Sequence, residues 1–330
     1  MVDWQACYRK VFMKIIKRIF SIPPDFLFLG LFGIVLGSTI LKYGGSLKWV
    51  DGSIVLPAIG ASIVFVWSVL YKSIKNRISS LKEIWFIIVG SAKVLRDWLP
   101  LILMILVYEN LKDKTALMEH KTIEWKLAEL DAAIFGGVQP TQWLERFTHP
   151  VIVDLMAINY ALYFILPLSV WFALYLMKNQ KGFYEVSTAM IATLYIGYIG
   201  YVVFPAAPPR FTLTYNAPLP SLFLHHFLQS NWDKAAAVML GAFPSLHVGL
   251  SSISIIFAYR YRRVLPKGNL FLYIVTPLTV NLWFSTVYLR HHWVVDIIAG
   301  WIVAITGSII AIFGVRFWLR KRDEMLQKED

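Results

Sequence analysis

Two residues near the carboxyl end of the chain have types and spacing suited to chemistry. His292 and Asp296 stand four positions apart, which places two side chains on one face of a helix. The carboxylate can then accept a hydrogen bond from one ring nitrogen and leave the other as an oriented nucleophile or general base. Asp296 falls inside a predicted membrane helix, where an unpaired carboxylate is costly, so a functional pairing is expected. His291 points about 100° away from this face.

A second polar cluster, residues 241–247, precedes another apolar stretch. Pro244 is predicted at a first helical position, so the amides that follow it, beginning with Ser245, lack helical acceptors. The same helix end carries the positive pole of the helix dipole and is typical of a phosphate site. His247 would lie about one turn inside the helix, within reach of a bound anion. The cluster therefore predicts a phosphate cradle with a titratable imidazole.

A third cluster, residues 204–210, contains three prolines that stop a helix and stiffen the backbone. They hold Arg210 near the membrane surface, either to bind an anion or as an interfacial anchor. A metal site made from His247, His291, His292 and Asp296 is ranked lower, because the usual helical histidine pair with a glutamate is missing. No metal and no cofactor are expected.

Membrane helices must position these clusters. The chain has 330 residues, of which 58% are apolar and 16% charged. The mean hydropathy is +0.59. This composition excludes an intrinsically disordered chain and a soluble nucleic-acid-binding protein. Crossing a bilayer takes about 20 mostly apolar residues in a helix. Eight stretches qualify: 26–42, 53–71, 84–107, 152–177, 186–204, 244–260, 269–288 and 293–316.

The net charge of +12 follows the predicted topology. If the amino terminus is cytoplasmic, most of the 32 Lys and Arg residues lie in cytoplasmic segments, as the positive-inside rule requires. Both termini are then cytoplasmic, and all three polar clusters lie on the outer face. The stretch 84–107 is the weakest predicted span because it contains the charged residues Lys93, Arg96 and Asp97. Lys93 and Asp97 are four positions apart and could form an ion pair.

The segment between the third and fourth spans predicts an amphipathic helix on the outer interface. Ile123, Leu127, Leu130 and Ile134 recur at helical spacing. A packing role is favoured over a gating role. The single cysteine, Cys7, excludes an internal disulfide framework.

The cluster at 241–247 and the segment that contains His292 and Asp296 resemble signatures of the type 2 phosphatidic acid phosphatase superfamily. Its patterns are Pro-Ser-Gly-His and Ser-Arg-x5-His-x3-Asp. This chain has Pro244-Ser245-Leu246-His247 and Ser285-Thr286-x5-His292-x3-Asp296. Ala-Phe-Pro-Ser-Leu-His at 242–247, with Tyr288-Leu289-x-His291-His292, is similar to the inositol phosphorylceramide synthase branch.

The resemblance implies an all-α polytopic membrane protein of about eight transmembrane helices with a six-helix catalytic core. The resemblance covers the core at 151–318, and hydropathy and charge divide the rest into an amphipathic segment at 1–25, accessory helices and an interfacial segment at 26–150, and a tail at 319–330. The first superfamily signature, Lys-x6-Arg-Pro, is incomplete because Val203 stands where the lysine should be. Thr286 likewise replaces an arginine, and Arg290 is expected to reach the same phosphate instead.

The resulting hypothesis is transfer of a phospho-headgroup, phosphoinositol in this branch, from a phospholipid to a lipid alcohol. His292 attacks phosphorus to form a phosphohistidine, while His247 serves as general acid and then base. Arg210, Ser245 and Arg290 hold the phosphate. Two alternatives remain: a lipid phosphate or polyprenyl diphosphate phosphatase, and a non-catalytic lipid-binding or transport protein. The expected setting is the plasma membrane or a Golgi equivalent, with lipids and no nucleic acid as partners.

Overall fold

The structure of the chain is a computed structural model. It describes residues 16, 19–42, 66–67, 69–71, 74–75, 80–109, 122–235, 240–267 and 269–327. Within these residues the regular structure is helical, apart from an isolated bridge between Ala206 and Gly241. The all-α prediction is therefore confirmed for the described part of the chain.

The helices follow one another with short connections in the second half of the chain. Their bounds are α2 (Pro24–Lys42), α4 (Leu81–Glu109), α6 (Glu124–Ile134), α7 (Pro140–Trp143), η3 (Leu144–Phe147), α8 (Pro150–Ala161), α9 (Ile165–Leu176), α10 (Gln180–Val203), α11 (Pro209–Thr212), α12 (Leu224–Ala235), α13 (Leu246–Arg260), α14 (Asn269–Tyr288) and α15 (Val294–Leu326).

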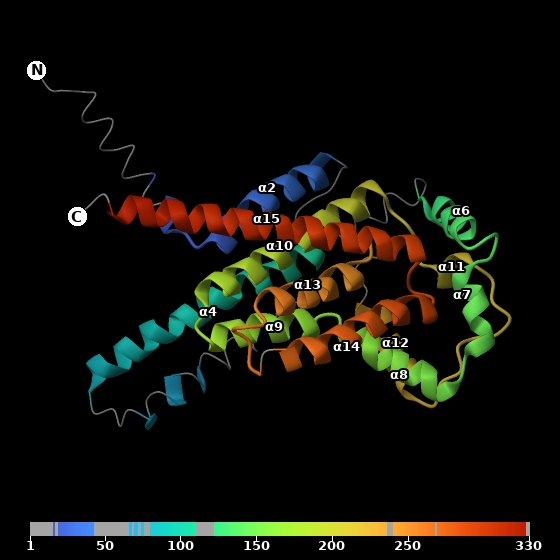
Figure 1. Cartoon of the computed structure of the whole chain (residues 1–330), viewed down its shortest axis with the longest axis horizontal. Helices are drawn as coiled ribbons and strands as arrows, with labels where there is room; N and C mark the ends of the chain where they lie inside the picture. Colours follow the sequence, from blue (N-terminus) through green and yellow to red (C-terminus); the bar gives the residue numbers. More distant parts are fainter. Residues whose placement is uncertain are drawn as a thin grey trace, which may run out of the picture.

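Helix α10 is the centre of the fold. In its 18-residue apolar window, 83% is buried, against 33% for α14 and 39% for α15. It packs against α2, α9, α13 and α15. Figure 1 shows α15 (red) running beside α10 along the long axis, with its first turn near α6 and α11 and its last turn near the carboxyl terminus. Helix α13 packs against α10, α14 and α15, so its first turn is held at that same end.

The membrane prediction is confirmed in part. Among the described residues, α10, α14 and α15 are long and apolar enough to cross a bilayer. The expected span 152–177 is instead two helices, α8 and α9, bent by 42°, which make a fourth crossing if they form one broken span. The expected span 244–260 is the 15-residue helix α13, about 22 Å long and shorter than the hydrocarbon layer. Eight spans and a six-helix core are not established by these lengths.

The amino-terminal spans are less well defined. Helix α2 has a shorter apolar stretch, Pro24–Ser38, and most of 53–71 lies outside the described residues. Within α4, Asp97 pairs with its neighbour Arg96 at 2.6 Å, and the side chain of Lys93 lies outside the description. The division into segments at 25, 150 and 318 stays a prediction.

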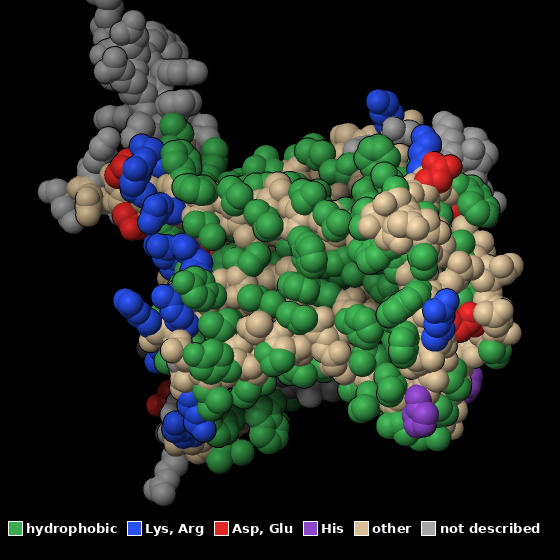
Figure 2. All heavy atoms as spheres, turned by 45° about the vertical axis from the view of Figure 1, so that its right-hand side comes forward, with side chains coloured by type: hydrophobic (Ala, Val, Ile, Leu, Met, Phe, Trp, Pro, Cys, Tyr) green, Lys and Arg blue, Asp and Glu red, His purple; other side chains and the backbone are tan. Residues whose placement is uncertain are grey.

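The surface has the pattern of an integral membrane protein. Figure 2 shows a broad hydrophobic band between two ends that carry the charged side chains. One end has a concentration of Lys and Arg, and the other has mixed charges and histidine. The apolar helices and this band identify a protein embedded in a membrane.

Candidate active site

The fold brings the three polar clusters of the sequence together at one end of the bundle. Each pair of clusters is joined by a backbone hydrogen bond. These bonds run from Ala242 N–H to Ala206 O (3.1 Å), from Arg210 N–H to Arg290 O (3.0 Å) and from Ser245 N–H to Asp296 O (3.1 Å). The clusters thus form a single backbone framework at the first turns of α13 and α15.

His292 is the centre of this framework. Its Nδ1 lies 3.2 Å from Asp296 Oδ2 and 3.0 Å from the carbonyl oxygen of Ala242. Two acceptors at Nδ1 assign the proton to that nitrogen and leave the lone pair on Nε2. Nε2 faces His247, whose Nδ1 is 3.4 Å away. His292 and Asp296 are both buried, so the pair is shielded from water.

The pairing of His292 with Asp296 arises from a helix cap. The spacing of His292 and Asp296 predicts that both lie on one helix. Helix α15 begins at Val294, however, so His292 lies in the turn that precedes it. Asp296 Oδ2 also accepts the backbone N–H of Trp293 at 2.9 Å. One carboxylate therefore caps the helix and orients the imidazole.

Ser245 makes two hydrogen bonds inside the framework that its sequence did not predict. Helix α13 begins at Leu246, so Pro244 precedes the cap and is not the first helical residue. Ser245 Oγ accepts the N–H of Val248 at 3.3 Å, and its own amide donates to Asp296 O. The hydroxyl and the amide of Ser245 thus both hydrogen-bond to backbone atoms. The binding of phosphate by Ser245 stays a prediction.

Arg290 is held by the residues that surround it. Its guanidinium donates to Ala217 O at 3.0 Å and to Glu145 Oε1 at 3.3 Å, and it lies over the ring of Tyr215. Its backbone is left-handed, with φ of 64°, in the turn between α14 and α15. Arg290 therefore fixes the 215–217 loop to the turn that contains His291 and His292. Its contact with phosphate stays a prediction.

Glu145, the partner of Arg290, was not identified from the sequence. Burial opposes its ionisation, but hydrogen bonds from Ala217 and Asn216 and the charge of Arg290 hold its pKa below the ordinary value. Arg210 is joined to Arg290 by its backbone N–H, and its guanidinium lies 4.5 Å from the centre of the Phe211 ring. Two guanidinium groups and one carboxylate thus border the framework.

Aromatic rings from other helices enclose the histidines. Tyr160 stacks on His247 and on His291, with ring centres 4.3 and 4.5 Å apart. Tyr163 lies 4.2 Å from His247, and Trp232 of α12 lies 4.7 Å from Tyr160. No motif marks these aromatic residues, because they come from elements remote in sequence. They give the imidazoles an apolar wall.

Helix α6 has a positioning role through Asp131. Its carboxylate accepts the backbone N–H groups of Val294 and Val295, both at 2.9 Å. Burial raises the pKa of Asp131, and these two hydrogen bonds oppose the rise. Of the predicted apolar stripe, Leu127 is buried in the protein whereas Leu130 is 50% exposed, and the position of this helix on the membrane interface stays a prediction. The buried carboxylate attaches α6 to the start of α15, together with the apolar cluster in which Ile123 and Leu127 pack with Trp293 and Val295.

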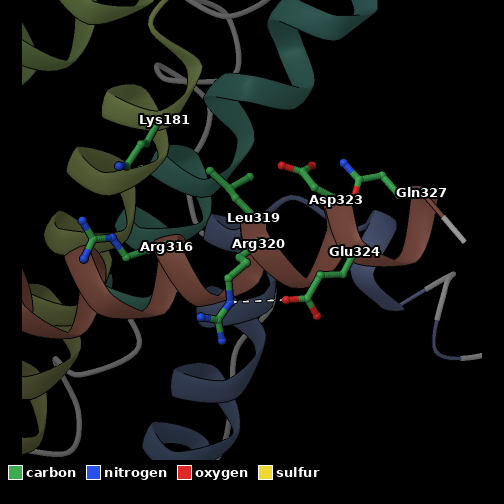
Figure 3. Close-up of a pocket in the computed structure, with 7 residues that line it drawn as sticks. All are labelled: Lys181, Arg316, Leu319, Arg320, Asp323, Glu324 and Gln327. Atoms are coloured by element: carbon green, nitrogen blue, oxygen red, sulfur yellow. Dashed lines mark ion pairs between the residues drawn. The ribbon is translucent and has the colours of Figure 1, made fainter.

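A pocket of about 470 Å³ lies at the opposite end of α15. It is lined by Lys181, Arg316, Leu319, Arg320, Asp323, Glu324 and Gln327 (Figure 3). About 30 Å of helix separates Asp296 from Arg316. The pocket therefore lies away from the predicted chemistry. Among the described residues, no group of three His, Cys, Asp or Glu side chains is arranged to hold a metal ion.

Comparisons with known proteins show the family of this chain. A family model described as the PAP2 superfamily matches residues 125–310, more than half of the chain and all of the site residues named above. No solved structure matches the chain.

Three curated relatives have named activities. The phosphoinositol dihydroceramide synthase of Bacteroides thetaiotaomicron is 25% identical over 57% of this chain and 67% of its own length. The inositol phosphorylceramide synthase catalytic subunit of Saccharomyces cerevisiae is 34% identical over 30% of this chain and 26% of its own length. A Dictyostelium discoideum PA-phosphatase related-family protein is 31% identical over 33% of this chain and 20% of its own length. The matches to the latter two proteins thus span about a quarter or less of those relatives.

Proposed function

Because this chain belongs to the PAP2 superfamily and is a lipid phosphotransferase or phosphatase, we propose that it moves phosphoinositol from a phospholipid to a lipid alcohol. The observation that carries the proposal is the pair of imidazoles, His292 Nε2 and His247 Nδ1, 3.4 Å apart. Asp296 orients His292 so that its Nε2 can attack phosphorus. The names of two relatives above supply the headgroup and the ceramide-like class of acceptor.

In the first step, His292 Nε2 attacks phosphorus. The N–P bond forms while the bond from phosphorus to the diacylglycerol oxygen breaks, and His247 donates a proton to that oxygen. The imidazolium of the phosphohistidine keeps its Nδ1 proton directed at Asp296, which stabilises the positive charge. The contact between the two histidines opens to admit the phosphate.

In the second step, the hydroxyl group of the lipid alcohol gives its proton to His247. Its oxygen attacks phosphorus, the N–P bond breaks and His292 is regenerated with its lone pair on Nε2. Arg210 and the amides at the first turn of α13 stabilise the equatorial oxygens of the phosphate. Arg290, already bound to Glu145, adds positive potential and fixes the turn that carries His292.

A lipid acceptor is favoured over water by the walls of the site. Tyr160, Tyr163 and Trp232 surround the imidazoles with aromatic surface, which an alkyl chain contacts well and water does not. The altered first signature, with Val203 in place of lysine, also resembles the transferase branch. A phosphatase has the same first step and differs in using water in the second.

Lipid product analysis tests the proposal. The purified full-length protein is given phosphatidylinositol labelled in the inositol ring, with and without ceramide. We expect label in a new lipid only when ceramide is present, and a loss of at least about a thousandfold in His292→Ala. His226→Ala changes a histidine of α12 that is exposed and serves as the matched control.

Each other outcome has a clear meaning. Water-soluble inositol phosphate, formed equally with and without ceramide, would identify a hydrolase. Transfer that persists in His292→Ala would remove His292 as the nucleophile.

A further inference from the structure

Two buried histidines near the catalytic pair have ring nitrogens that no part of the described structure satisfies. His225 is 6% exposed, and neither its Nδ1 nor its Nε2 has a hydrogen-bond partner among the described residues. His291 is 5% exposed, and its Nε2 is likewise unpartnered there. Buried polar atoms are nearly always hydrogen-bonded in native proteins. Three such atoms on two neighbouring elements point to a missing polar ligand.

The first turn of α12 is built to present His225. The carboxylate of Asp154, on α8, accepts the hydroxyl of Ser221 at 2.7 Å and the backbone N–H of His225 at 2.9 Å. It also accepts the N–H groups of Phe223 and Leu224, both at 3.3 Å. Asp154 therefore fixes the start of α12, including the backbone of His225, on α8.

The face of α12 that carries His225 is turned toward the active site. His225, Leu228 and Trp232 recur at positions i, i+3 and i+7 and share one side of the helix. The ring of Trp232 lies 4.7 Å from Tyr160 and 5.8 Å from His291. Because Tyr160 also stacks on His247, only the Tyr160 ring lies between this face of α12 and the catalytic pair.

The charges around His225 define the ligand that it can bind. Burial is the main cause that lowers the pKa of His225 to about 4. The positive charges of His226, Arg210 and Arg290 also lower this pKa, and the negative charge of Asp154 opposes them. At neutral pH the ring is therefore uncharged and offers one N–H donor and one acceptor nitrogen.

His291 has the same character. Burial is the main cause that lowers its pKa well below the ordinary value. A hydroxyl group is both donor and acceptor, so it matches a neutral imidazole. An ammonium headgroup would instead be repelled by Arg210 and Arg290.

We propose that His225 and His291 form a headgroup site that hydrogen-bonds the hydroxyl groups of a polyol headgroup whose phosphate lies at His292. This inference rests on the proposed function and assigns the selection of a sugar-like headgroup to α12 and the catalytic turn. His225 lies outside every sequence signature discussed above.

Kinetics of three variants test the assignment. In His225→Phe we expect the KM for phosphatidylinositol to rise about tenfold or more, because two hydrogen bonds to the headgroup are lost. The kcat at saturating donor should stay within about threefold, since the catalytic pair is unchanged. His225→Gln, which keeps a donor and an acceptor, should recover most of the loss. His226→Phe, on the exposed neighbour, should behave as the native protein. Equal KM values in the native protein and His225→Phe would overturn the assignment.

A binding measurement separates this inference from the proposed function. Inositol 1-phosphate and inorganic phosphate are titrated into the full-length protein, and their Kd values are compared. We expect the native protein to prefer inositol 1-phosphate about tenfold or more and His225→Phe to lose that preference while still binding phosphate. An absence of preference in the native protein would overturn the inference even if lipid transfer occurs. A preference that depends on His225 without any lipid transfer would uphold the inference and refute the proposed reaction.

Discussion

At the scale of single residues, the site depends on side chains that serve two purposes. Asp296 Oδ2 accepts the N–H of Trp293 and faces Nδ1 of His292. The capping bond holds the carboxylate in place before any substrate binds. The imidazole is therefore oriented in advance, which reduces the reorganisation needed at the transition state.

Replacing Asp296 with asparagine should separate these purposes. Asp296→Asn keeps an oxygen to cap Trp293 N–H but removes the negative charge that stabilises the His292 imidazolium. We expect kcat to fall by about 10²–10⁴ with little change in KM or in thermal stability. Steady-state transfer assays and a melting curve in detergent would check this. A large drop in melting temperature with unchanged kcat would mean that the cap is the only role of Asp296.

His225 should leave a signature in the pH dependence of stability. Its pKa is about 4 in the folded protein against an ordinary value of 6.5. Between these pH values the unfolded chain binds a proton that the folded chain excludes. The contribution of His225 to the free energy of unfolding is therefore complete above pH 6.5 and is lost as the pH falls toward 4. We expect the melting temperature of the native protein to fall more steeply across this window than that of His225→Phe. Parallel curves for the two proteins would show that His225 is not buried as a neutral ring.

At the scale of elements, close approach of α13 and α15 determines the distance between His247 and His292, the two histidines proposed to be catalytic. Gly300 allows this approach, because a Cβ at this position would lie 2.6 Å from the carbonyl oxygen of Ser245. Ser245 in turn donates its amide to Asp296 O. The first turns of both helices are thereby joined directly by backbone, and His247 is brought to His292.

Helix α6 should contribute to activity without touching the substrate. Asp131→Ala removes the acceptor of two amides at the start of α15, a loss of about 1–3 kcal/mol in the free energy of unfolding. We expect a lower melting temperature and a lower kcat, because the turn that holds His292 is less firmly fixed. Glu129→Ala, on the exposed side of the same helix, is the matched control. If Asp131→Ala had the same stability and activity as this control, α6 would have no positioning role.

At the scale of the whole molecule, the two charged ends correspond to the two sides of a membrane. Helix α15 has 33 residues and is about 50 Å long, so it extends past a hydrocarbon layer of about 30 Å. Its last turns carry Arg316, Arg320, Lys321 and Arg322, at the end where Figure 2 shows the Lys and Arg concentration. By the positive-inside rule we propose that this end is cytoplasmic and that the active site faces the other side.

Labelling with a membrane-impermeant maleimide would test this orientation. The single natural cysteine is first removed by Cys7→Ser, and a new one is introduced by His226→Cys or Arg320→Cys. In sealed cells we expect only the variant at 226 to react, whereas after permeabilisation both should react. The reverse pattern would place the active site on the cytoplasmic side.

Local features of the chain were predictable from sequence because they depend on neighbours a few positions apart. The long apolar stretches predict the helices, and the spacing of His292 and Asp296 predicts their contact, even though a capping turn and not a helical face produces it. The Pro-Ser-Leu-His signature indicates the superfamily. These features follow from helical geometry and hydropathy, which a single segment determines by itself.

The remainder depends on which segments pack together, and only the tertiary structure decided it. Tyr160, Asp131 and Glu145 contact the site from α8, α6 and η3, and no local pattern marks them. Packing also places the polar groups of Ser245 and Arg290 against backbone and Glu145, contacts that their motifs do not predict, and their binding of phosphate stays a prediction. A hydrogen bond or ring contact between distant segments requires both partners in register, and the packing of the whole helical bundle sets that register.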